Sequence, residues 1–119
     1  MDRLNSILWD ERDLLEDLLF ALEVDRWVRA SGRDRFAARA QGRLRETGAL
    51  LRRTEVVRAA ESDAAAVRLG LAPSPSLAQL AERVGDPWRT ILLDQRTALR
   101  AATREVARAG RATAAPADL

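Results

Sequence analysis

Apolar residues in the first quarter of the chain repeat with the period of an α-helix. Two series, one position apart, recur at steps of seven residues: Ile7, Leu14, Ala21 and Val28, and then Leu8, Leu15 and Leu22. Together they predict an apolar stripe wide enough to contact two neighbouring helices. Asp2 is the expected N-cap and Gly32 the expected stop, because glycine readily takes the left-handed conformation of a C-cap. The pattern predicts a helix over residues 3–31, with Trp9 and Trp27 beside its stripe, capping the edge of a core.

The segment from Asp34 to Gly70 is also predicted to be helical. Its apolar residues lack the alternation of a strand, and Asp34 is the expected N-cap. Gly42 and Gly48 lie inside this segment, where a glycine costs about 1 kcal/mol relative to alanine. We expect the helix to bend or fray there. Alternatively, the two glycines let a neighbouring helix approach closely.

A proline-containing turn separates this helix from a short one. Pro73 and Pro75 break the helical pattern, because proline has no N–H and disfavours helix in the preceding residue. Ser76 and Gln79 then have the spacing of a capping box. This spacing predicts a short connecting helix that ends at Gly85.

The last predicted helix begins at Pro87, with Asp86 as its N-cap. A coiled-coil seam follows, with alternating steps of four and three residues: Trp88, Leu92, Gln95, Leu99, Ala102, Val106 and Ala109. Gly110 is expected to end the helix, and residues 111–119 are expected to form a disordered tail. The predicted fold is all-α. One domain, residues 1–110, forms an antiparallel up-down-up bundle of three long helices, with the short connecting helix before the last.

Composition argues against an enzyme or a metalloprotein. The chain has no Cys and no His, so it lacks thiolate and imidazole ligands and the usual pairs of nucleophile and base. We therefore expect no catalytic residues, no metal and no cofactor. The chain start does not resemble a signal peptide, and no uncharged stretch is long enough to cross a membrane. A cytoplasmic protein without membrane insertion is expected.

Charge is unevenly distributed along the chain. Residues 1–25 have a net charge of −6 and the remaining residues +8, for a total of +2. The acidic first helix should therefore attract the later ones. The acidic run from Asp10 to Asp17 lacks the ligand offsets of a calcium loop and the histidines of a helical di-metal site. We interpret this run as a solvated helix face.

All 20 basic residues are arginine. Because clustered arginine neutralises phosphate, a nucleic-acid-binding helical module is one alternative function. No recognisable base-reading motif occurs, however, and the arginines of the last helix flank its seam. We therefore expect no nucleic-acid partner. A second alternative is a structural protein that self-associates as a coiled coil.

Three stretches, in this order, resemble the FlgN-type flagellar export chaperones in their actinobacterial form. They are residues 4–16 (LNSILWDERDLLE) with their continuation to Arg33, the segment Leu69-Gly70-Leu71 with Ser76 to Ala81, and residues 87–94 (PWRTILLD). The resemblance implies a helical bundle without enzyme activity. Such a chaperone binds hook-associated, filament-junction proteins in the cytoplasm, prevents their premature assembly and delivers them to the export apparatus.

In that family the client is held mainly through the C-terminal half, which corresponds here to the seam that begins at Trp88. A chaperone of this kind needs an apolar groove that covers an amphipathic helix of its client. We expect Trp88, Ile91, Leu92 and Leu99 to contribute to this groove, although burial of Trp88 inside the bundle is an open alternative. The identity of the client and the oligomeric state stay open.

Overall fold

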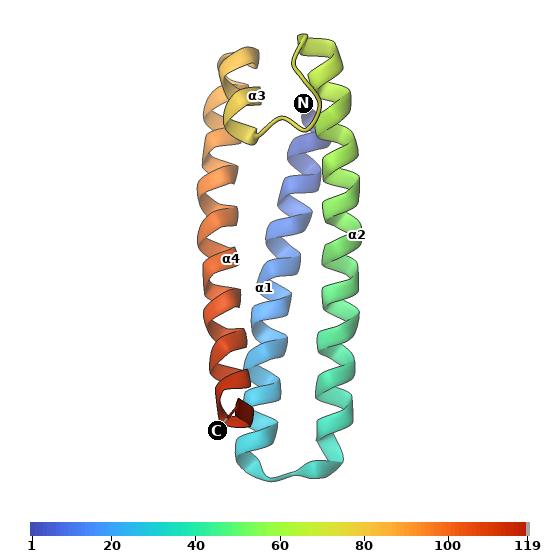
Figure 1. The fold of residues 1–119 in the computed structure, drawn as a ribbon, viewed down its shortest axis with the longest axis vertical. Helices are drawn as coiled ribbons and strands as arrows, with labels where there is room; N and C mark the ends of the chain where they lie inside the picture. Colours follow the sequence, from blue (N-terminus) through green and yellow to red (C-terminus); the bar gives the residue numbers. More distant parts are fainter. Residues whose placement is uncertain (119) are drawn as a thin grey trace.

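The computed structural model describes the backbone of residues 1–118 and the side chains of residues 1–111, and the regular secondary structure of this part is entirely helical (Figure 1). The elements, in chain order, are α1 (Asp2–Ser31), a 3-10 turn (Asp34–Phe36), α2 (Ala37–Leu69), α3 (Leu77–Val84) and α4 (Trp88–Asp118). No strand occurs in the part of the chain described, so the all-α prediction is confirmed. The molecule is elongated, measuring 55 × 23 × 20 Å. In the view of Figure 1, α1 lies between α2 and α4.

Local signals in the sequence set several helix ends correctly. Gly32 and Gly70 have left-handed φ angles of 68° and 70° and end α1 and α2 as predicted. The capping box before α3 is also confirmed. The Gln79 N–H donates to Ser76 Oγ at 3.1 Å, and the Ser76 N–H donates to Gln79 Oε1 at 2.9 Å.

Two predicted N-caps are wrong. Asp2 is already part of α1, whose N-cap position is Met1, and Asp34 starts the 3-10 turn instead of capping α2. Neither carboxylate accepts a capping hydrogen bond from its helix. An acidic residue near a helix start is favourable through the helix dipole even without such a bond, which explains why the residue type alone misplaces the boundary by a residue or more.

The start of α4 is shifted by one residue from its predicted position, to Trp88 instead of Pro87. Asp86 nevertheless caps this end. Its Oδ1 accepts hydrogen bonds from the backbone N–H of Thr90 at 3.2 Å and from the Thr90 hydroxyl at 2.8 Å.

At its other end, α4 passes through Gly110 and runs to Asp118. Gly110 therefore does not end the helix, because a single glycine weakens a helix without terminating it. The side chains of residues 112–118 and the whole of residue 119 lie outside the described residues. The predicted disordered tail over residues 111–119 falls mostly on this part.

The main apolar core lies at the end of the bundle where α3 packs on α4. Six side chains, each at most 1% exposed, form one cluster drawn from all four helices: Leu4, Leu8, Ala65, Leu80, Ala81 and Leu92. Figure 1 shows α3 at the same end as the N-terminus. The cluster therefore fixes the first turns of α1 and α4 against the last turns of α2.

Gly42 and Gly48 do not mark a close approach of helices. α2 continues through both positions without interruption. An added Cβ would meet only an arginine of α2 itself, Arg45 Nη2 at 3.9 Å from position 42 and Arg52 Nη1 at 3.4 Å from position 48. Among the described residues, no atom of another helix lies within 4 Å of either position.

The Gly42→Ala substitution is therefore expected to raise the free energy of unfolding by about 0.5–1 kcal/mol, since alanine loses less backbone entropy in a helix. Urea denaturation followed by circular dichroism measures this gain. Gly70→Ala is the matched control, and it should lose stability because its φ of 70° strains any residue with a Cβ. A loss of stability in Gly42→Ala would instead reveal tight packing at that position.

Candidate functional site

An open groove lies between α2 and α4, with α1 as its floor. Both α2 and α4 pack on α1, but among the described residues no Cα atom of α2 lies within 8 Å of one of α4. The arrangement of the three helices is visible in Figure 1. The groove has a volume of about 750 Å³ and also reaches the start of α3, at Ser76 and Leu77.

The walls of the groove combine apolar side chains with charged ones. The apolar contributors come from all four helices: Leu15, Leu51, Leu77, Leu99 and Val106. The charged contributors are Glu11, Glu55, Arg58, Arg96, Arg100 and Arg104. On α4 the lining runs from Arg96 to Val106, which is about 15 Å of helix. Apolar side chains flanked by charged ones over this length fit the apolar face of an amphipathic helix.

Of the four residues predicted for the binding surface, only Leu99 lines this groove. Leu92 is fully buried in the core cluster and cannot contact a partner while the bundle is folded. Trp88 and Ile91 are partly exposed and lie outside the groove lining. The cause is α3, which packs on the first turns of α4 and covers that half of the seam, leaving the later half open.

Glu11, interpreted from the sequence as part of a solvated face, is in fact buried at 5% exposure. Its carboxylate accepts a hydrogen bond from Arg58 Nε of α2 and forms an ion pair with it. Burial raises the pKa of Glu11 above its ordinary value, and the hydrogen bond and charge of Arg58 oppose part of that rise. The pair lies at the floor of the groove and joins α1 to α2.

Gln95 forms the corresponding link between α1 and α4. It is 2% exposed, which confirms its inward seam position. Its Oε1 accepts a hydrogen bond from Arg12 Nη1 at 3.2 Å, and its Nε2 donates to Asn5 Oδ1 at 2.8 Å. A satisfied polar residue in an apolar seam fixes the register of two helices, because a shifted register leaves it unpaired.

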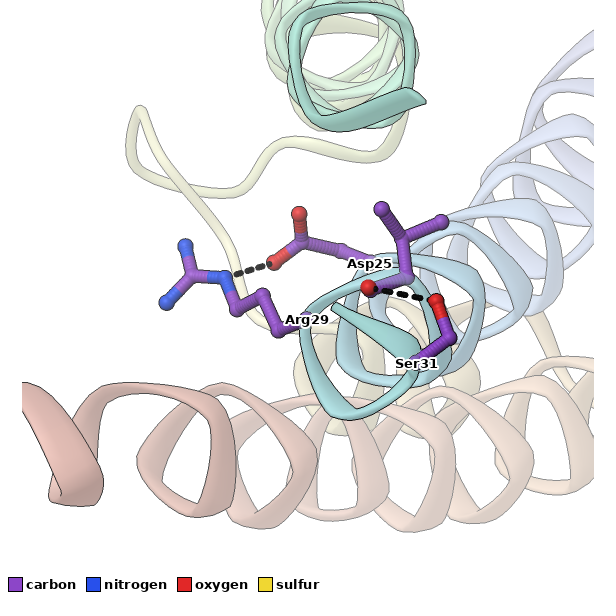
Figure 2. Close-up of polar contacts among 4 residues, drawn as sticks. Asp25, Arg29 and Ser31 are labelled. Carbon is purple, nitrogen blue, oxygen red and sulfur yellow. Dashed lines mark hydrogen bonds and ion pairs between the residues drawn. The ribbon is translucent and has the colours of Figure 1, made fainter. Parts of the chain in front are cut away.

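A second buried carboxylate, Asp25, lies near the C-terminal end of α1 (Figure 2). It is 1% exposed. Arg29, one turn further along α1, places its Nε 3.0 Å from Asp25 Oδ2, but the geometry is that of an ion pair without a hydrogen bond. Figure 2 also shows the Ser31 hydroxyl, which donates to the Val28 carbonyl at 2.8 Å.

The sequence contains a signal for both buried acids, although neither belongs to the two series of apolar residues at steps of seven. Alternating steps of four and three residues run along the inner face of α1: Leu4, Leu8, Glu11, Leu15, Leu18, Leu22 and Asp25. Both acids therefore occupy seam positions. The neighbouring acids Asp10, Asp13, Glu16 and Asp17 are exposed, as predicted. Among the described residues, no group of three or more His, Cys, Asp or Glu side chains is arranged to hold a metal ion.

Comparisons with known proteins identify no relative of this chain. No protein-family model, no curated protein and no solved structure matches this chain. Within the described residues, none of the helices combines the length and the apolar character that a membrane span requires.

Proposed function

We propose that this protein is a cytoplasmic export chaperone of the FlgN type. It holds hook-associated flagellar proteins by packing one of their helices, prevents their premature assembly and delivers them to the export apparatus. The observation behind the proposal is the open groove between α2 and α4, which has the length, apolar lining and charged edges that an amphipathic client helix requires. The three long helices, in an antiparallel up-down-up arrangement, leave the fourth position of a bundle to the client.

The charges at the edge of the groove favour a particular kind of client helix. Arg96, Arg100 and Arg104 follow one another at steps of four residues along α4, on the groove side. Steps of four keep the three guanidinium groups on one edge of the helix. A client helix with acidic residues beside its apolar stripe meets these arginines, while its apolar face covers Leu51, Leu77 and Leu99.

Co-expression with candidate hook-associated proteins, followed by size-exclusion chromatography with light scattering, tests this function. We expect a defined complex that is lost when the terminal helix of the client is trimmed. Elution of the chain alone, or only as its own oligomer, would favour the structural coiled coil and would reduce the family resemblance to shared helix composition.

Two neighbouring leucines of α2 provide a matched pair of variants. Leu51 lines the groove, whereas Leu50 is 46% exposed and lies outside it. Leu51→Asp should weaken client binding at least about tenfold, because a carboxylate in the apolar contact must be desolvated. Leu50→Asp should change it by less than about twofold. Equal effects of the two variants would exclude the groove as the binding site.

A further inference from the structure

Three aromatic side chains on the outer face of α1 are left in water. Trp9 is 48% exposed, Phe20 61% and Trp27 76%. The expectation that the two tryptophans cap the edge of the core is therefore wrong for Trp27 and only partly met by Trp9. Aromatic side chains contribute most when they are buried, and a row of exposed rings on one element is typical of an interaction site.

The three rings form a single line along α1. At about 100° per residue, Phe20 stands about 20° from Trp9 around the helix axis, and Trp27 falls back in line with Trp9. The line is about 27 Å long, at about 1.5 Å per residue. It points away from the groove, because Glu11 and Leu15 of the same helix face the groove. A partner on this line and a client in the groove therefore do not compete for space.

Acidic side chains accompany the rings on the same face. Asp13, Glu16, Asp17 and Glu23 lie between the first ring and the last along the chain, and all four are exposed. None of them forms an ion pair with another described residue. The three ion pairs among the described residues involve Glu61, Asp25 and Glu11 instead. The face therefore presents four acids without an ion-pair partner among the described residues, beside three exposed rings.

We propose that this face of α1, defined by Trp9, Phe20 and Trp27 with the four acids, is a docking surface for a basic amphipathic helix of a partner protein. The apolar stripe of such a helix covers the rings, and its Lys and Arg residues pair with the acids or stack on the rings. The structure already contains one contact of this type, since the Arg12 guanidinium lies 3.9 Å from the centre of the Trp9 ring.

A second copy of this chain complements the surface poorly. Among the described residues, α4 has no exposed large apolar side chain to cover the rings. The outer side of α2 has such residues and several arginines, but the exposed acids Glu46 and Asp63 lie among them. Like charges would then oppose each other at several points. A helix with basic residues on both sides of its stripe avoids this repulsion.

The test uses two synthetic amphipathic helical peptides that share one leucine stripe and differ only in their flanking residues, Lys and Arg in one and Glu in the other. Isothermal titration calorimetry with the full chain should show binding of the basic peptide that weakens with added salt, and a blue shift of tryptophan emission should accompany it. The acidic peptide should not shift the emission of Trp9 and Trp27, because it suits the arginine-edged groove instead.

Two variants locate the site of binding. The triple substitution Trp9→Ala, Phe20→Ala and Trp27→Ala should weaken the basic peptide at least about tenfold, and so should neutralisation of the four acids to Asn and Gln. Val67→Ala, on α2 and 82% exposed, should leave it unchanged. The proposal is overturned if the basic peptide does not bind, if both peptides bind the α1 face equally, or if binding persists after the three rings are removed. It is also overturned if the chain forms a dimer that the triple substitution abolishes.

Discussion

The Leu92→Asp substitution is expected to lower the free energy of unfolding by more than about 4 kcal/mol, a large part of the stability of a domain of this size. Leu92 is fully buried in the cluster that contains Leu8 and Leu80. The substitution removes the burial of a leucine and places a carboxylate in a cluster of buried apolar side chains. Urea denaturation followed by circular dichroism measures the loss.

Leu99→Asp is the matched control on the same seam. Leu99 is partly exposed at the groove, close to the lining residues Arg96 and Arg100, so its carboxylate reaches water and positive charge. We expect it to cost no more than about 2 kcal/mol. Equal losses of stability in the two variants would contradict the core described here. If Leu99→Asp loses client binding, Leu99 contacts the client, because this variant stays folded. If Leu92→Asp loses client binding, the cause is unfolding of the bundle.

The difference between Leu92 and Leu99 shows where sequence reasoning reaches its limit. A heptad pattern identifies the inward face of a helix, and both leucines lie on it. It does not say which stretch of that face is covered by another element. Here α3 packs on the first turns of α4 and buries Leu92, and the groove begins only beyond that point.

Features that depend on neighbouring residues were predicted well. The capping box of Ser76 and Gln79 and the left-handed stops at Gly32 and Gly70 need only the local chain, and all are present. These signals, with the apolar periodicity, were sufficient for an all-α fold with its four helices in the right order.

Features that depend on distant partners were not predicted. Glu11 is buried because Arg58, 47 residues later, folds onto it, and a count of local charge cannot reveal that partner. The exposure of Trp27 has the same origin. Apolarity alone suggested burial, but the burial of an aromatic residue depends on whether another helix reaches its side of α1, and none of the described helices does.

The Arg58→Ala substitution should make the stability of the bundle depend on pH through Glu11. The loss of free energy of unfolding should reach at most about 3.5 kcal/mol near pH 7. That ceiling is the cost of protonating a carboxyl with an ordinary pKa of 4.5, at about 1.4 kcal/mol per pH unit. Without Arg58, only burial and the negative charge of Glu55 act on Glu11, and both raise its pKa.

The sign of this dependence follows from a pKa that is higher in the folded state than in the unfolded state. Such a group contributes its full stability below the unfolded pKa of 4.5 and loses it as the pH rises through the folded pKa. Relative to the parent, Arg58→Ala should therefore lose more stability near pH 7 than near pH 5, as measured by urea unfolding at both values. Adding Glu11→Gln should remove the difference, since the amide has no charge to desolvate. A loss that is equal at both pH values would show that Arg58 stabilises the bundle through the packing of its alkyl chain and not through its charge.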